Sequence, residues 1–322
     1  MLSEFDLIAR YFTRQPDPTG RVRLGVGDDC ALISPAAGQQ LAVSTDLLVE
    51  GRHFFAGADA AMLGHKSLAV NLSDLAAMGA RPVGFTLALA LPEVNENWLA
   101  AFSRGLLALA DQHSAELIGG DTTRGPLAIC ITVFGEVPYA LALRRDAACP
   151  GDDIWVSGTL GDARLALAVL HTTLSVDQQS FEAAARHLHQ PTPRVALGLA
   201  LRGVAHAAID VSDGLLGDLG HVLKRSGVGA HIDADALPVG TALAQQTQSL
   251  QRHFALNGGD DYELCFTAPV LNRQAVLAAA AASDTRVTCI GKITADTALL
   301  VTDQYGQPLA IAADSFDHFK NP

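Results

Sequence analysis

The sequence has no long apolar run and few charged residues. None of its apolar stretches reaches the roughly 20 residues that a membrane-spanning helix needs. The first residues, MLSEFDLIARYF, carry acids where a signal peptide would carry bases. Charged residues make up 17% of the 322 residues and hydrophobic residues 49%, a composition typical of a compact globular chain. We therefore expect a soluble, cytoplasmic protein with no membrane partner, long enough for two domains.

Cysteine is scarce, and its spacing indicates no site. The five cysteines are odd in number and widely separated, with no CxxC pair and no spacing typical of a metal site. Most lie in apolar, strand-like runs, so we expect buried thiols and no disulfide framework. The five are Cys30, Cys130, Cys149, Cys265 and Cys289.

Basic residues are outnumbered by acidic ones. The chain has 22 Lys and Arg against 34 Asp and Glu, which gives a net charge of −12. Nucleic-acid binding through phosphate contacts needs a basic surface, so we expect no nucleic-acid partner. A phosphorylated ligand that arrives with divalent cations remains compatible with this charge.

The familiar nucleotide-binding motifs are also absent. There is no GxxxxGK[ST], no HRD or DFG kinase signature and no dinucleotide GxGxxG. The nearest approach, LGHKS, falls inside an expected helix, and Lys66 is therefore interpreted as a surface residue. If the chain handles phosphate, it does so with another architecture.

What the chain does have is a recurrent pattern of aspartates at strand ends. An apolar run ends, a small or hydroxyl residue follows, and an aspartate comes next, at Asp28, Asp29, Asp46, Asp121, Asp210 and Asp213. Any one of these is more often a turn former or a helix cap. Several in one chain favour a cation site, because clustered carboxylates repel one another unless a cation bridges them. Oxygen ligands with few His or Cys suit Mg²⁺ bound together with phosphates.

The stretch KSLAVNLSDLAAMGARP predicts a helix that ends at Gly79, with Pro82 preventing its continuation. Ser67, Asn71 and Asp74 share one face of this helix. Taken alone, that face fits a solvated stripe. Beside the strand-end acids, Asp74 completes the predicted magnesium and phosphate site.

The order of predicted elements indicates two domains, 1–138 and 139–322. The first half reads β-β-α-β-α-β-β, an α+β layer with helices on one face of a mixed sheet. Its free sheet face is expected to be apolar, which favours a homodimer that packs sheet against sheet. Near Tyr139 the composition shifts to ALRRDAACPGDD, and the second half alternates strands and helices as an α/β domain.

Seven ordered motifs resemble the thiamine-monophosphate kinase family, within the superfamily of aminoimidazole ribonucleotide synthetase. They are GVGDDCA, STDLLVEGRHF, NLSDLAAMGARP, LIGGDTTRGP, PGDDIWVSGTLGDA, DVSDGLLGDLGH and NGGDDYELCF. The resemblance implies an N-terminal ATP- and Mg²⁺-binding domain that also dimerises, and several Mg²⁺ with ATP between the halves. It implies direct in-line transfer of the γ-phosphoryl group of ATP to thiamine monophosphate, which yields thiamine diphosphate.

The resemblance also assigns roles to residues, and none is a covalent nucleophile. Mg²⁺ ligands would be Asp29, Ser44, Thr45, Asp46, Asp74, Asp121, Asp210 and Asp213. ATP contacts would be Gly120, Asp121, Arg145 and Ser212, and thiamine monophosphate contacts would be His53, Asp260 and Phe316. Taken alone, Arg145 fits a surface arginine, His53 a partly buried histidine and Phe316 a residue that packs the tail against the core.

Two positions depart from the family pattern. Asp260 stands where the family usually has Glu, and Arg104 stands where some relatives have a nucleotide-contacting Tyr, so Arg104 is given no contact. Two alternatives stay open at this point. One is an ATP-dependent synthetase of the same superfamily, although GGDDYELCF and the His53 segment favour the kinase. The other is a nonenzymatic acidic metal-binding module.

Overall fold

The computed structural model describes residues 4–14, 17, 20–27 and 30–311. The chain divides into two compact units. The first unit comprises Met1–Leu75 and Ala80–Ala140, and the second comprises Ala76–Gly79 and Leu141–Pro322. Among the described residues, no helix has the length and apolar character needed to cross a bilayer.

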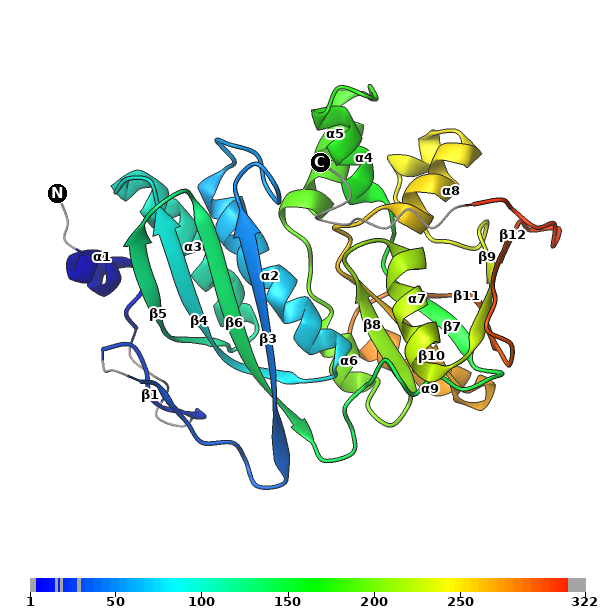
Figure 1. Ribbon diagram of the computed structural model, residues 1–322, viewed down its shortest axis with the longest axis horizontal. Helices are drawn as coiled ribbons and strands as arrows, with labels where there is room; N and C mark the ends of the chain where they lie inside the picture. Colours follow the sequence, from blue (N-terminus) through cyan, green and yellow to red (C-terminus); the bar gives the residue numbers. More distant parts are fainter. Residues whose placement is uncertain (1–3, 15–16, 18–19, 28–29, 312–322) are drawn as a thin grey trace. The chain divides into compact units, whose positions relative to one another are not determined.

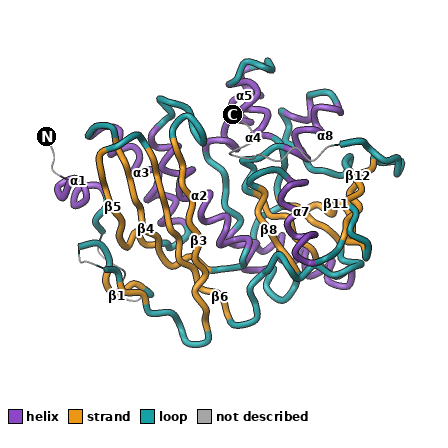
Figure 2. The backbone as a smooth tube through the Cα atoms, viewed as in Figure 1, coloured by secondary structure: helices purple, strands orange, loops and turns teal. Residues whose placement is uncertain are grey.

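The first unit is built on a four-stranded mixed sheet with strand order β3-β6-β4-β5. Its strands are β3 (Gln39–Val49), β4 (Arg81–Leu91), β5 (Glu116–Arg124) and β6 (Ala128–Pro138). The β4–β5 pair is parallel and the other two pairs are antiparallel. Helices α2 (Ala60–Ala77) and α3 (Glu96–Gln112) lie together on one face of the sheet (Figure 1, Figure 2). The predicted mixed sheet with helices on one face is confirmed.

Two small elements complete the first unit. Helix α1 (Glu4–Tyr11) precedes the sheet, and β1 (Val22–Leu24) pairs with β2 (Leu32–Ile33) in a short antiparallel ribbon. Helix α1 ends at Tyr11, with Arg10 in its last turn.

Burial alternates along the sheet as the period of two requires. On the helix-covered face, Ile129 and Ile131 of β6 are almost completely buried. On the other face of β3, Leu41, Val43 and Leu47 are 44%, 57% and 53% exposed. The free face of the sheet therefore carries large apolar side chains that the described part of the chain leaves exposed.

Helix α2 begins six residues earlier than Lys66 and packs very closely against α3. A Cβ on Gly64 would lie 2.1 Å from the Phe102 carbonyl oxygen, and one on Gly105 would lie 1.9 Å from the Ala61 carbonyl oxygen. Glycine permits this backbone contact because it has no side chain. The interpretation of Lys66 as a surface residue is wrong, because its exposed fraction is 4%.

The second unit is built on a six-stranded sheet with strand order β12-β9-β11-β7-β10-β8. Its pairs are antiparallel except for β12–β9. The strands are β7 (Asp153–Ser157), β8 (Ala207–Val211), β9 (Gly229–Asp233), β10 (Glu263–Ala268), β11 (Val287–Thr294) and β12 (Leu299–Thr302). Every residue of β7, β8 and β10 is buried, so both faces of these strands are covered.

Helices of the second unit lie between these strands along the chain, with three of them between β7 and β8. They are α4 (Asp162–Leu170), α5 (Gln178–His189), α6 (Val195–Ala200), α7 (Leu215–Ser226), α8 (Gln248–Asn257) and α9 (Arg273–Ala282). Short 3₁₀ turns occur at Leu243–Gln245 and Val270–Asn272. The break between α5 and α6 contains Pro191 and Pro193, and proline interrupts helical hydrogen bonding.

The five thiols are free, but they are not uniformly buried. Cys265 is buried, Cys130 and Cys289 are partly buried, and Cys30 and Cys149 are exposed. The expectation of buried thiols is wrong for the last two, because both lie in loops and not in strands.

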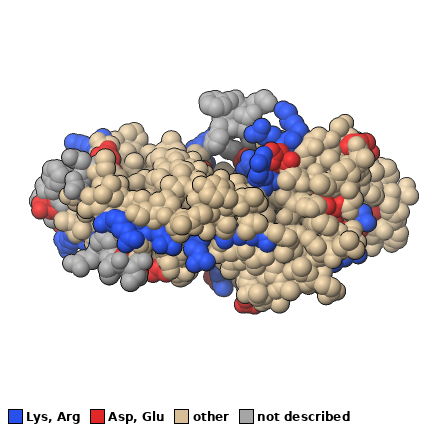
Figure 3. All heavy atoms as spheres, turned by 90° about the horizontal axis from the view of Figure 1, so that it is seen from below, with Lys and Arg blue, Asp and Glu red and all other residues tan. Residues whose placement is uncertain are grey.

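Most of the surface seen in Figure 3 is uncharged. On this face lysine and arginine side chains stand among uncharged residues, and some acidic side chains lie between them.

Candidate active site

Edge strand β3 and helix α2 form one group of oxygen ligands in the first unit. The Ser44 hydroxyl donates a hydrogen bond to Asp74 Oδ2 at 2.5 Å. The Asp46 backbone N–H donates to Asn71 Oδ1 at 3.2 Å. Because β3 has a neighbour on one side only, its outward N–H groups need such partners. The Asp74 carboxylate, the Ser44 hydroxyl and the Asp46 backbone thus lie between strand and helix, and the Asp46 side chain shares the Ser44 face of the strand.

Asn71 supports this group from within the helix. Its side chain is 1% exposed, and its Nδ2 donates to the Ser67 carbonyl oxygen at 3.0 Å. Its amide oxygen accepts from the Asp46 backbone. The face of α2 that carries Asn71 is therefore not a solvated stripe: Asn71 fixes the strand that presents Asp46.

Thr45 points away from this group. As the residue between Ser44 and Asp46 it faces the opposite side of the sheet. Its hydroxyl lies 2.9 Å from the Thr132 hydroxyl on β6. The Thr45 hydroxyl is therefore directed away from Asp74.

Gly120 and Asp121 lie on β5, at the opposite edge of the sheet. The pairings place Asp46, Ile131, Leu87 and Gly120 in one row across four strands. Three strand spacings of about 4.8 Å separate the ends of that row by about 14 Å. One ion with bonds of about 2.1 Å cannot join both edges. Within the first unit, the predicted ligands therefore form two separate groups.

The backbone conformation at position 120 requires glycine. It has a φ of +150°, and a Cβ on it would lie 1.8 Å from the Leu87 carbonyl oxygen. Both Gly120 and Asp121 are exposed. At these two adjacent residues, β5 thus offers an accessible backbone and a carboxylate.

In the second unit, a turn after β8 carries Ser212 and Asp213, while Asp210 lies in the strand with an exposed fraction of 4%. Asp218, in the first turn of α7, holds this turn. Its Oδ2 accepts the backbone N–H groups of Ser212 at 2.9 Å and Asp213 at 3.0 Å. Burial raises the pKa of the Asp218 carboxyl to about 7, and the positive charge of Arg145 acts in the opposite direction.

The turn that contains Asp260 is hydrogen-bonded to the end of β8 and to the turn that follows it. The Asp260 backbone N–H donates to the Ser212 carbonyl oxygen at 2.9 Å, and that of Tyr262 donates to the Val211 carbonyl oxygen at 2.8 Å. Asp260 has a φ of +65°. Aspartate enters this left-handed region more readily than most residues, which gives a backbone reason for Asp where the family usually has Glu. Predicted substrate and nucleotide contacts are therefore neighbours here.

Two buried acids, Asp261 and Glu263, follow Asp260 closely along the chain and accept hydrogen bonds from neighbouring segments. Asp261 accepts the Gly161 backbone N–H with both carboxylate oxygens at 3.0 Å. Burial raises the pKa of the Asp261 carboxyl well above its usual value, despite that hydrogen bond. Glu263 accepts a hydrogen bond from the Ser157 hydroxyl at 2.5 Å and a forked pair from the Arg194 guanidinium.

Sequence reasoning did not single out Asp218, Asp261 or Glu263. The signal was present, since all three fall within the motifs DVSDGLLGDLGH and NGGDDYELCF. What it could not show is that these acids face backbone N–H groups or buried partners and not solvent.

His53 follows β3 in a tight turn. Its Nδ1 accepts the Val49 backbone N–H at 3.0 Å, which leaves Nε2 as the donor nitrogen of the neutral ring. Arg145 is exposed, and its backbone carbonyl accepts from the Ser226 hydroxyl at 3.0 Å. Asp29 and Phe316, the other predicted site residues, lie outside the described residues.

The donors fit Mg²⁺ by their chemistry. The predicted ligands that the structure describes offer carboxylate, hydroxyl and carbonyl oxygens, which suit a hard cation. Gly120 adds an exposed backbone segment, of the kind that can receive phosphate oxygens.

Two successive α+β units with carboxylates at their strand ends define a protein of the AIR synthase related class. Residues 27–137 match the family described as AIR synthase related protein, N-terminal domain. Residues 149–304 match the AIR synthase related protein, C-terminal domain.

Relatives identify the family more narrowly. The chain is 50% identical to the thiamine-monophosphate kinase of Salmonella typhimurium, over 99% of both chains. It resembles the crystal structure of the thiamine-monophosphate kinase from Stenotrophomonas maltophilia, with a TM-score of 0.84 and 51% identity over 91% of this chain and 93% of that one. A structure described as AaThiL complexed with AMPPCP and TMP matches with a TM-score of 0.77 and 28% identity over 88% and 89%. The chain belongs to the thiamine-monophosphate kinase family.

Proposed function

We propose that this chain phosphorylates thiamine monophosphate with ATP and so produces thiamine diphosphate and ADP. The observation that carries this proposal is 50% identity over 99% of a thiamine-monophosphate kinase. A relative in complex with AMPPCP and TMP supports both substrates. The chain is a kinase of thiamine diphosphate biosynthesis.

Bound Mg²⁺ would neutralise the two anionic reactants, whose mutual repulsion opposes transfer. The proposed ligands are Asp29, Ser44, Thr45, Asp46, Asp74, Asp121, Asp210 and Asp213. The 14 Å estimate between the two sheet edges argues that more than one ion is held. No protein nucleophile is needed, because an oxygen of the substrate phosphate attacks the γ-phosphorus directly.

For ATP, we propose Gly120, Asp121, Arg145 and Ser212. The absence of a side chain at Gly120 lets a phosphate approach the backbone, and the Arg145 guanidinium is a forked donor for phosphate oxygens. Asp218 keeps Ser212 in place by accepting its N–H group. In this proposal Mg²⁺ neutralises charge, and the residues of the chain position ATP.

For thiamine monophosphate, we propose His53, Asp260 and Phe316. The Nε2–H group of His53 is suited to a phosphate oxygen, given that Nδ1 already accepts the Val49 N–H group. The Asp260 carboxylate complements the positively charged thiazolium ring. An aromatic side chain at Phe316 suits stacking on a cationic ring.

We further propose that the chain is a cytoplasmic homodimer whose first domain, 1–138, binds ATP and Mg²⁺ and forms the dimer, with 139–322 as the second domain. Leu41, Val43 and Leu47 on the free face of the first sheet support this, because exposed apolar side chains gathered on one face favour association.

The test is the formation of thiamine diphosphate by the purified full chain, with thiamine monophosphate, ATP and excess Mg²⁺, followed by chromatography. We expect product that depends on all three additions. A nonenzymatic metal-binding module would bind Mg²⁺ without turning over ATP. Absence of thiamine diphosphate under these conditions contradicts the proposal.

A further inference from the structure

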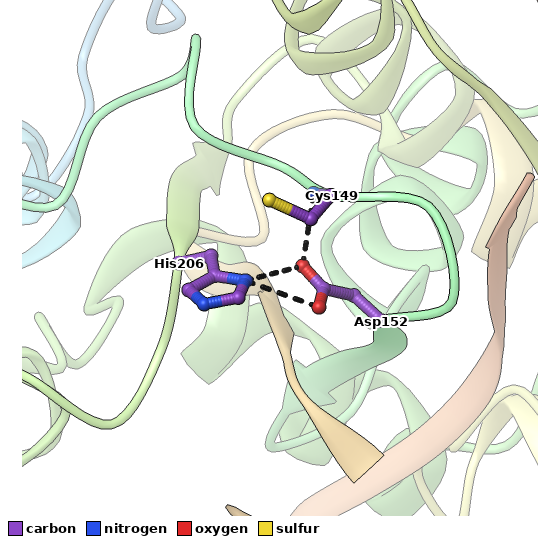
Figure 4. A group of neighbouring side chains, drawn as sticks. All are labelled: Cys149, Asp152 and His206. Atoms are coloured by element: carbon purple, nitrogen blue, oxygen red, sulfur yellow. Dashed lines mark hydrogen bonds and ion pairs between the residues drawn. The ribbon is translucent and has the colours of Figure 1, made fainter. Parts of the chain in front are cut away.

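Three side chains of the second unit meet in a group that the proposed reaction does not use. Cys149 and Asp152 lie in the loop before β7, and His206 directly precedes β8. One ligand atom of each residue lies within 4.8 Å of the other two (Figure 4). The three offer a thiol, a carboxylate and an imidazole.

Hydrogen bonds already orient two of these side chains. His206 Nδ1 lies 2.9 Å from Asp152 Oδ2 and 3.1 Å from Oδ1. Asp152 Oδ2 also accepts the Cys149 backbone N–H at 3.0 Å. The thiol is held less tightly, since its contact to the Ala147 carbonyl oxygen measures 3.6 Å. Figure 4 shows the imidazole and the carboxylate directed at each other, with the thiol beside them.

The six-stranded sheet of the second unit fixes the backbone that carries these three side chains. The His206 N–H group donates to the Thr267 carbonyl oxygen of β10 at 2.8 Å. The Asp152 carbonyl oxygen accepts from Ile293 of β11 at 2.9 Å. The two segments are therefore held in register by strands, and the site does not depend on a free loop.

The three residues differ in their exposure to solvent. Asp152 is 3% exposed, whereas Cys149 is exposed and the His206 side chain is 40% exposed. A cation could reach the group from solvent and find a carboxylate that is already removed from water. The open side also leaves room for a water ligand.

We propose that Cys149, Asp152 and His206 bind a Zn²⁺ ion, with its fourth position taken by water. Thiolate, imidazole and carboxylate together favour zinc over Mg²⁺, which prefers oxygen ligands alone. Atoms around a tetrahedral zinc stand about 3.3 to 3.6 Å apart at ordinary bond lengths. Small side-chain rotations convert the observed arrangement into that one: the imidazole and carboxylate separate slightly, and the thiol moves inward.

The Asp152 hydrogen bond to the Cys149 backbone serves as an outer contact that orients a ligand, a feature common in metal sites. Binding to the folded state alone stabilises a protein by mass action. Zinc is thus expected to raise the melting temperature of this chain without any contribution from ATP or thiamine monophosphate.

The test uses Co²⁺ as a spectroscopic substitute for zinc. The full chain is reduced, freed of metal with a chelator and titrated with Co²⁺ in excess Mg²⁺ without nucleotide, so that oxygen sites are occupied. We expect a near-ultraviolet thiolate-to-cobalt charge-transfer band with one equivalent of Co²⁺, which Zn²⁺ then abolishes. The band reports a sulfur ligand, which the proposed magnesium site lacks.

Matched variants identify the ligands. Cys149→Ser should remove the band, and His206→Ala should weaken zinc affinity at least about tenfold, the smaller end of the loss that follows removal of even an outer partner. Cys30→Ser removes the other exposed thiol and His221→Ala removes an exposed histidine of α7, and both should bind as wild type does.

Absence of the band in wild type overturns the proposal, as does its persistence in Cys149→Ser. Unchanged zinc affinity in His206→Ala also overturns it. Circular dichroism of the metal-free variants checks that each is folded; Cys149 and His206 are both partly open to solvent, so their replacement leaves no core cavity. Enzyme activity plays no part in the readout, and the result is independent of the proposed function.

Discussion

The sheets of the two units are completed in different ways. In the second unit, every residue of β7, β8 and β10 is buried. In the first unit, helices cover one face and large apolar side chains of β3 remain exposed on the other. A sheet whose two faces are buried within its own chain needs no partner, whereas a sheet with one exposed apolar face favours association with another chain.

The candidate site residues differ in the same way. On β3 and α2, side chains hold one another, as Ser44 does with Asp74. Beyond β8, a buried carboxyl at Asp218 holds backbone N–H groups of the predicted contacts. Replacing Asp74 in the first unit should therefore remove a ligand, whereas replacing Asp218 in the second unit should displace a turn.

The largest effect is expected from Asp74→Asn. Loss of a metal ligand removes charge stabilisation of the transition state, so kcat/KM should fall at least about 100-fold while the melting temperature changes little. Steady-state assays of thiamine diphosphate formation measure this. Asp111→Asn, on the exposed surface of α3, is the control. Near-normal turnover in Asp74→Asn would remove β3 and α2 from the site.

Val43→Asp tests whether the open face is a dimer interface. In a two-fold interface the new charge is introduced on both sides, and its burial is unfavourable. Sedimentation velocity should show dimer in wild type and a shift to monomer in this variant. Leu271→Asp, at a side chain 95% exposed in the second unit, should leave the dimer intact. A wild-type monomer would show that the open face has no copy of this chain on it.

Asp218→Ala should lower kcat/KM about tenfold and destabilise the chain by about 1–3 kcal/mol, because two backbone N–H groups lose their acceptor. Asp218→Asn keeps an acceptor oxygen and should recover part of both losses. Assays and urea unfolding measure the two quantities. If both variants kept wild-type activity, the turn at Ser212 would not depend on this carboxyl.

The smallest effect concerns pH and Asp261. Burial raises the pKa of its carboxyl above that of the unfolded chain, so the folded state retains its proton to higher pH. The unfolding free energy contributed by Asp261 is therefore fully present below about pH 4 and is lost as the pH rises through the folded pKa. Asn resembles the protonated form and does not titrate.

Asp261→Asn should therefore gain stability relative to wild type as the pH rises. Urea unfolding of both proteins at about pH 5 and about pH 9 measures the difference, and the sign follows from the raised pKa. Exposed Asp284→Asn, outside the buried cluster, should show no such trend. A pH-independent difference between Asp261→Asn and wild type would mean that Asp261 is already ionised in the fold.

Local sequence predicted much of this molecule. The mixed sheet with helices on one face follows from apolar periodicity, and the end of α2 follows from Gly79, which has a φ of +63°. The ordered motifs carried the family and its reaction, because they are contiguous and each holds its own acids. Asp74 and Asn71 were placed on one helix face by spacing alone.

Other features depend on which strands and loops become neighbours, and spacing along the chain does not encode that. The separation of Asp46 from Asp121 follows from the strand order β3-β6-β4-β5. The burial of Lys66 follows from its surroundings in the folded unit. Cys149 and His206, 57 residues apart, meet because β10 holds the His206 backbone and β11 holds that of Asp152, which lies in the same loop as Cys149. The sequence determined the chemical groups and the local elements, whereas long-range pairing decided which groups share a site.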